Sequence, residues 1–167
     1  DVIAPELPGY GDSAGQPAAV SIAGYAQQVL GALDRLNIPR FHLLGHSMGG
    51  MIAQQIAASN PDRVDQLICY GTGPQGVLPE RFEPIAQSRA RLKTDGVPAT
   101  ARRIATNWVG NGAQDREFGD CVAVGAQVSE QAALAGLDAM EGWDGRAALT
   151  GIAQKTLVIW GDRDRSY

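Results

Sequence analysis

The sequence contains little that would suit binding to nucleic acid or to a membrane. Its 167 residues include 14 lysines and arginines against 18 acidic residues, for a formal net charge of −4, and the basic residues form no run. We therefore expect no nucleic-acid partner. No stretch approaches the roughly 18 to 20 consecutive apolar residues of a membrane span. We accordingly expect no membrane partner.

Cysteine and histidine are scarce, with two of each. Cys69 and Cys121 lie far apart and match no metal-ligand spacing, so we expect two free, buried thiols and no metal site. Free thiols are compatible with a cytoplasmic protein, which is the location we expect. The chain begins with Asp1 rather than methionine, inside what reads as a strand, so we expect a fragment of a longer protein.

The composition is typical of a globular domain, with 44% hydrophobic and 19% charged residues. Apolar residues recur at helical spacing after the N-cap residue Ser21, which predicts a helix from Ile22 to about Leu36. Strands are predicted at continuous apolar runs, which are typical of strands covered on both faces in a parallel sheet. These strands are Asp1–Ile3, Phe41–Leu44, Val64–Tyr70 and Thr156–Trp160, with a second helix over Met48–Ala58.

A long segment between the last two of these strands has a different amino-acid composition. From about Gly73 to Gln154 it is rich in Ala, Arg, Gln and Glu and is broken by glycines and prolines. No period recurs, so we predict a small helical lid rather than a repeat array. The predicted fold is α/β, a parallel sheet flanked by helices with a helical lid insertion. Residues 1–72 would form the core, residues 73–154 the lid, and residues 155–167 the last core strand and an acidic loop.

The main functional motif lies in the segment FHLLGHSMGG, residues 41–50. Within it, Gly45 to Gly49 form a G-x-S-x-G pentapeptide between a predicted strand and a predicted helix. At such a turn a serine is held in a strained conformation with its hydroxyl exposed, and the first N–H groups of the helix point towards it. We therefore predict that Ser47 is a nucleophile. We also expect that a Cβ at Gly45 or Gly49 would collide with the neighbouring backbone.

Four motifs in order resemble the α/β-hydrolase fold family, and within it the lid-bearing esterases, lactonases, perhydrolases and carbon–carbon hydrolases. They are LPGYGDS at residues 7–13, GHSMGG at 45–50, NPDRV at 60–64 and VIWGDRD at 158–164. The resemblance implies a serine–acid–histidine triad in that chain order, with Asp164 as the acid and Asp162 as its rival. It also implies an oxyanion hole formed in part by the backbone N–H of Met48.

The chain offers no convincing base for Ser47. Its two histidines, His42 and His46, both precede the serine, whereas the family order places the histidine after the acid. Neighbouring strand side chains diverge, so the His46 ring should point away from the Ser47 hydroxyl, and His42 is expected in the core or an interface. We thus expect a hydrolase truncated at both ends, which lacks its histidine, a second oxyanion donor and a strand beside Phe41–Leu44.

The expected function is serine-dependent hydrolysis of an ester, lactone or related acyl bond of a small molecule, without a cofactor. A carbon–carbon hydrolase or perhydrolase of the same fold, and a non-catalytic hydrolase-like fragment or binding domain, stay open as alternatives. Trp108 and Trp143 could line a substrate pocket, although aromatic residues in helical segments are more often core. The oligomeric state is left open. The lid arginines are expected on a solvated face: Arg81, Arg89, Arg91, Arg102 and Arg103.

Overall fold

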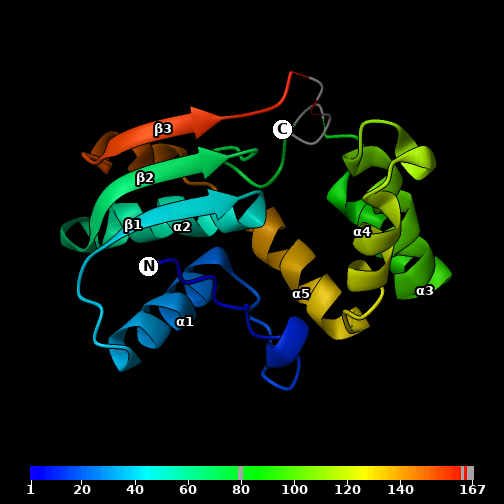
Figure 1. Ribbon diagram of the computed structural model, residues 1–167, viewed down its shortest axis with the longest axis horizontal. Helices are drawn as coiled ribbons and strands as arrows, with labels where there is room; N and C mark the ends of the chain where they lie inside the picture. The colour runs from blue at the N-terminus through cyan, green and yellow to red at the C-terminus, as the bar shows by residue number, and fades with distance from the viewer. Residues whose placement is uncertain (79–80, 163, 165–167) are drawn as a thin grey trace.

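A computed structural model of the chain describes residues 1–78, 81–162 and 164. Its centre is a parallel sheet in the order β1-β2-β3, formed by Phe41–His46, Val64–Tyr70 and Lys155–Ile159. Figure 1 shows the three strands side by side, with their carboxyl ends directed towards the helices of the lid. The predicted α/β architecture with a parallel sheet is confirmed.

Two helices build the core on one face of this sheet. The first, α1 (Ile22–Arg35), begins at Ser21, whose hydroxyl accepts a hydrogen bond from the Gly24 N–H at 3.0 Å. The second, α2 (Met48–Ser59), follows β1 directly, packs against β1 and β2, and is covered in turn by α1. Both helices lie where the sequence predicted them. The largest fully buried side chains of this core are Ile22, Tyr25, Met51, Ile56 and Leu67.

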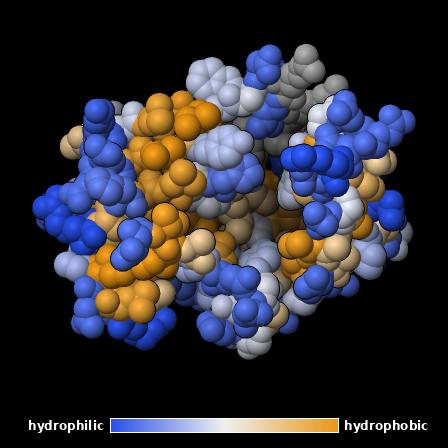
Figure 2. Space-filling model, in the orientation of Figure 1, coloured by the Kyte–Doolittle hydropathy of each residue, from blue (hydrophilic) through white to orange (hydrophobic). Residues whose placement is uncertain are grey.

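The other face of the sheet is largely exposed in the described part of the chain. By their register Leu44, Ile68 and Leu157 lie side by side on this face, and Leu44 and Leu157 are 60% and 53% exposed. The apolar runs had predicted strands covered on both faces, whereas α2 covers one face of β1 and β2, and every residue of β3 is exposed. Figure 2 shows apolar side chains gathered over the strands. Among the described strands β1 pairs with β2 alone, so its other edge is open, as expected.

The strand expected at Asp1–Ile3 is not formed. Residues 1–7 belong to no strand, and the Val2 side chain is 96% exposed. A short apolar run becomes a strand only where a neighbouring strand binds its backbone N–H and C=O groups. None of the described strands pairs with this segment, so the prediction is wrong.

Three helices lie within the range predicted as the lid: α3 (Ile85–Trp108), α4 (Phe118–Gly125) and α5 (Glu130–Glu141). The first is kinked at Gly96, which has a φ of 79° and stands two residues before Pro98. Figure 1 shows α3 and α4 away from the sheet, with α5 between them and the core. Among the described residues no helix is long and apolar enough to cross a membrane. Short 3-10 helices occupy Gly11–Ser13, Pro61–Arg63, Gly112–Gln114 and Arg146–Gly151.

Arg89, Arg91 and Arg103 form ion pairs, so the expected solvated face is only partly right. Arg91 and Arg102 are exposed, as expected. The Glu83 carboxylate, 6% exposed, binds Arg103 at 2.8 Å and Arg91 at 3.4 Å, and it accepts a hydrogen bond from the Ser88 hydroxyl at 2.6 Å. Burial raises the pKa of the Glu83 carboxyl, but these hydrogen bonds and the arginine charges outweigh it, so the pKa lies below its ordinary value. Arg89 binds two acidic residues of α5. Charged side chains therefore link the two halves of α3 through Glu83, and α3 to α5 through Arg89.

Candidate active site

The turn between β1 and α2 has the strained geometry that the sequence predicted. Ser47 has a φ of 53° and a ψ of −124°, in a region of backbone conformation that residues other than glycine rarely adopt. Its N–H donates to the carbonyl oxygens of Tyr70 and Gly71, each at 3.1 Å. Its own carbonyl oxygen accepts a hydrogen bond from the Thr72 hydroxyl at 2.8 Å. The segment from Tyr70 to Thr72, at and just beyond the end of β2, thus holds the turn in its strained conformation through three hydrogen bonds.

One of the two glycine predictions is confirmed and the other is wrong. A Cβ on Gly45 would lie 2.2 Å from the carbonyl oxygen of Gly49, so no side chain fits there. A Cβ on Gly49 would meet nothing within 4 Å. The second crowded position is Gly50, where a Cβ would lie 2.4 Å from the Thr72 side chain. Close packing of α2 against the end of β2 therefore depends on Gly50, one residue beyond the pentapeptide.

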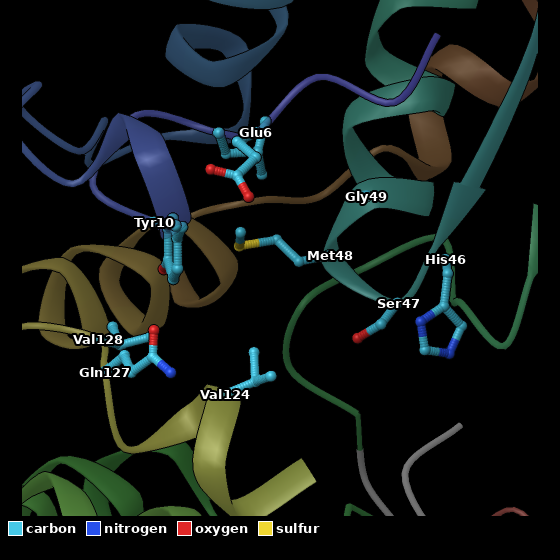
Figure 3. A pocket seen from close by; sticks show the side chains of 11 residues that line it. Glu6, Tyr10, His46, Ser47, Met48, Gly49, Val124, Gln127 and Val128 are labelled. Carbon is cyan, nitrogen blue, oxygen red and sulfur yellow. The ribbon is translucent and has the colours of Figure 1, made fainter. Parts of the chain in front are cut away.

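Two cavities meet at Ser47. The smaller, of about 390 Å³, lies between the 7–13 loop, the start of α2 and the end of α4. The larger, of about 1190 Å³, is a cleft between the carboxyl ends of the strands and the lid. Figure 3 shows the Ser47 hydroxyl pointing into the space in front of Met48 and Val124. The serine is therefore accessible from both sides.

Met48 contributes to the site through its backbone and its side chain. It is the first residue of α2, where N–H groups have no partner within the helix and carry the positive end of the helix dipole. Such an N–H beside the serine can stabilise a developing oxyanion. The Met48 side chain lines the smaller cavity (Figure 3).

Both candidate acids lie at the larger cleft with the serine. Asp162 and Asp164 line it together with Ser47, and the Asp164 N–H donates to the Gly161 carbonyl oxygen at 3.1 Å. The Asp164 carboxylate and the His46 ring both lie beside Gly71, within 3.5 Å of the point a Cβ there would occupy. Gly71 has a φ of 47°. No motif pointed to this glycine, although its place directly after a predicted strand could have suggested it.

Neither histidine faces the serine hydroxyl. The His46 ring packs against the Tyr70 ring with 4.9 Å between centroids, and Figure 3 shows it directed away from the Ser47 Oγ. His42 is exposed on β1 rather than buried in the core. Five residues of strand span roughly 16 Å, so His42 lies too far along β1 to reach the hydroxyl. The described residues contain no group of three or more side chains that could hold a metal ion.

The two lid tryptophans have different environments. Trp108 is 64% exposed and lines the larger cleft, where a ligand could contact it. Trp143 is 8% exposed and packs in the main core, and its ring N–H donates to the Gln55 side-chain oxygen at 3.3 Å. The structure therefore places Trp143 in the core that contains α2 and not at either cavity.

A strained serine at the turn between a parallel strand and a helix is the geometry that a G-x-S-x-G segment takes in the α/β-hydrolase fold. The family model described as "alpha/beta hydrolase fold" matches residues 1–166. The chain therefore belongs to the α/β-hydrolase fold family.

Three similar proteins illustrate the relationship. The pimeloyl-[acyl-carrier protein] methyl ester esterase of Klebsiella pneumoniae is 31% identical over 95% of this chain and 63% of its own length. A 2-hydroxy-6-oxononadienedioate/2-hydroxy-6-oxononatrienedioate hydrolase of Paraburkholderia phymatum is 39% identical over 54% of this chain and 31% of its own length. The crystal structure of the enol-lactonase from Burkholderia xenovorans matches with a TM-score of 0.83 and 25% identity, over 94% of this chain and 60% of that one.

The chain is shorter than its relatives. It spans 63% of the esterase and 60% of the enol-lactonase, and it spans 53% of other curated relatives.

Proposed function

We propose that Ser47 is the nucleophile of a hydrolase that acts on an ester, lactone or related acyl bond of a small molecule. Its hydroxyl attacks the carbonyl carbon, and the Met48 N–H stabilises the oxyanion that develops. Water then hydrolyses the acyl-enzyme. The observation that carries the proposal is the strained Ser47, with a φ of 53°, exposed at two cavities.

The remaining triad members follow from the same proposal. Asp164 orients a histidine, which takes the serine proton and returns it to the leaving group. Asp164 is favoured over Asp162 by its position in the motif, and both lie at the cleft. The histidine is neither His42 nor His46, because His42 lies far along β1 and the His46 ring points away from the hydroxyl.

Hydrolysis of p-nitrophenyl acetate by the purified chain, beside its Ser47→Ala variant, tests the proposed base. Loss of a triad base lowers the rate by several orders of magnitude, so both proteins should stay close to the uncatalysed rate. Strong turnover that disappears in Ser47→Ala would show that a group of this chain acts as the base.

The nucleophile itself is tested in a longer form of the protein that carries a histidine beyond residue 167. A fluorophosphonate probe should label Ser47 there, and Ser47→Ala should abolish the labelling. Failure to label a folded, longer form would overturn the hydrolase proposal in favour of a non-catalytic binding domain.

Carbon–carbon bond hydrolysis is the second candidate. It is favoured by the similarity to the 2-hydroxy-6-oxononadienedioate hydrolase, which covers 54% of the present chain. Assaying the longer form with that dienedioate and with an aryl ester separates the two reactions by the ratio of the two kcat/KM values.

A further inference from the structure

The longest helix of the lid, α3, consists of two halves that are separated by a kink. Gly96 has a φ of 79° and a ψ of 171°, a conformation that only glycine adopts readily. Two residues further on, Pro98 has no backbone N–H to donate within the helix. A Cβ on Gly96 would meet only the Pro98 ring within 4 Å, so little packs against the kink. The backbone can therefore bend here more easily than within either half.

The half of α3 before the kink is fixed to the core through α5. Arg89 binds Asp138 at 2.7 Å and Glu141 at 2.6 Å, and both acidic residues lie on α5. Ala139, which lies between them in the sequence, is 1% exposed and belongs to the main core. We call residues 85–95 of α3 together with α5 the inner lid. The inner lid is thus continuous with the core that supports the sheet.

The half of α3 after the kink packs with α4. The Arg102 guanidinium carbon lies 5.6 Å from the centre of the Phe118 ring, at the start of α4. At the other end of α4, a Cβ on Gly125 would lie 3.1 Å from the Ala101 Cβ, so the two helices approach closely there. We call residues 97–108 together with α4 the outer lid. Figure 1 shows α3 and α4 on the side of α5 that faces away from the core.

The outer lid forms a wall of both cavities at Ser47. Val124 of α4 lines the smaller cavity. Four residues near the end of α3 line the larger cleft: Ile104, Thr106, Asn107 and Trp108. A displacement of the outer lid away from the core would therefore widen both cavities together.

A buried carboxylate connects the outer lid to the inner lid. Glu83, 6% exposed, accepts a hydrogen bond from the Ser88 hydroxyl at 2.6 Å and pairs with Arg91 at 3.4 Å, both before the kink. Across the kink it binds Arg103 at 2.8 Å. Among the described residues, the buried Arg103 Nη2 and Thr100 Oγ1 have no hydrogen-bond partner, which opposes this arrangement of the outer lid. The Glu83–Arg103 ion pair offsets that cost.

We propose that the outer lid is a gate, which turns about Gly96 and is held closed by the Glu83–Arg103 ion pair. Residues 97–108 span about 18 Å, so a turn of about 20° at the kink moves the far end of α3 by about 6 Å. The inner lid stays on the core during this movement. A ligand that spans Ser47 then reaches both cavities through a single opening. The inference goes beyond the proposed function, because it holds whichever bond Ser47 cleaves.

Spin labels measure the movement of the outer lid directly. Cys121 lies on α4 and is partly exposed, whereas Cys69 is buried, so a nitroxide reagent reacts at Cys121. A second label at Gln27→Cys, an exposed position of α1, gives the distance between the core and the outer lid by double electron–electron resonance. Arg103→Gln breaks the pair across the kink and should add a population in which this distance is several ångströms longer.

Arg91→Gln is the matched control, because it removes an arginine from the same carboxylate within the inner lid. It should leave the distance from Gln27 to Cys121 unchanged. Labels at Gln27→Cys and Lys93→Cys, in a Cys121→Ser background, should give one distance with and without Arg103→Gln, because the inner lid does not move. Equal distances to Cys121 with and without Arg103→Gln would overturn the proposal, and so would an equal change in Arg91→Gln or at Lys93.

The hinge is tested independently of the ion pair. Gly96→Ala keeps the pair but places a Cβ where the backbone conformation suits glycine alone, so the kink and the distance between the core and outer-lid labels should both change. Gly151→Ala is the matched control, because Gly151 has no positive φ and its Cβ would meet nothing within 4 Å. Circular dichroism identifies any variant that does not fold, and if Arg103→Gln is one, Gly96→Ala decides. An unchanged distance in folded Gly96→Ala would contradict a hinge at this residue.

Discussion

Two glycines of the serine turn have opposite structural requirements. Gly45→Ala would place a Cβ 2.2 Å from the Gly49 carbonyl oxygen, so β1 and α2 would have to separate. We expect it to lower the free energy of unfolding by roughly 2 kcal/mol or more. Gly49→Ala meets nothing within 4 Å and removes a flexible residue from a helix. It should leave the free energy of unfolding unchanged or raise it by up to about 1 kcal/mol. Urea unfolding measures the free energy of unfolding of both variants, which carry the same substitution at different positions. An equal loss in the two variants would contradict this account.

The motif predicted the position of the serine but only part of what surrounds it. The spacing of G-x-S-x-G, a strand before it and a helix after it were enough to predict the strained turn at Ser47, because that strain is a local backbone property. The crowding at Gly50 comes from Thr72, which lies in a different segment. Contacts of that kind depend on how the elements pack, so the pentapeptide could not distinguish Gly49 from Gly50.

Within the lid, Glu83 connects the start of α3 to its second half. Glu83→Gln keeps the shape of the side chain but removes the charge that Arg91 and Arg103 bind. We expect a loss of roughly 2 kcal/mol in the free energy of unfolding, because the arginines keep their charge at a partly buried site. The folded pKa of Glu83 lies below its ordinary value of 4.5, so its stabilisation is complete above about that pH and is lost as the pH falls further.

Urea unfolding at pH 7 and below pH 4 measures both parts of this expectation. The difference between the native chain and Glu83→Gln should be present at pH 7 and should shrink in acid. Glu141→Gln is the matched control, because Glu141 is 44% exposed and shares Arg89 with Asp138. A surface pair of this kind contributes little to the free energy of unfolding, because water and salt screen it. Equal losses for the two variants at pH 7 would show that burial of Glu83 has no energetic role.

For the segment between β2 and β3, the sequence predicted the helices but not the contacts between them. Helical segments, glycines and prolines between the strands predicted a helical lid, and three helices occur there. The pairing of its arginines was not predicted, because Arg89 finds its acidic partners about 50 positions away, on α5. Trp143 is a similar case. Its place in the core follows from packing against α2, a segment far away in the sequence.

At the scale of the whole molecule, the strands were easier to predict than their neighbours. Continuous apolar runs predicted β1, β2 and β3, because the strands of a parallel sheet carry such residues locally, although β3 is exposed along its whole length here. Whether a run pairs with another strand is a property of the whole sheet. Asp1–Ile3 has a similar composition and forms no strand, since none of the described strands lies beside it. For the same reason the sequence could not predict that one sheet face would stay exposed.

The exposed sheet face predicts that the chain associates with itself. Leu44 and Leu157 are 60% and 53% exposed on the same face, and β1 has an open edge among the described strands. Contiguous exposed apolar surface beside an open strand edge favours association between chains. Sedimentation velocity at increasing protein concentration should show a larger associated fraction for the native chain than for Leu44→Lys or Leu157→Lys.

These lysine variants should keep the free energy of unfolding within about 0.5 kcal/mol, because both side chains are exposed before substitution. Val20→Lys adds the same charge at a residue that is 67% exposed and lies outside the sheet, so it separates the effect of the face from that of net charge. If Val20→Lys reduces association as much as Leu157→Lys does, charge repulsion accounts for the change. Association lost only in the sheet variants would identify this face as the surface through which the chains meet.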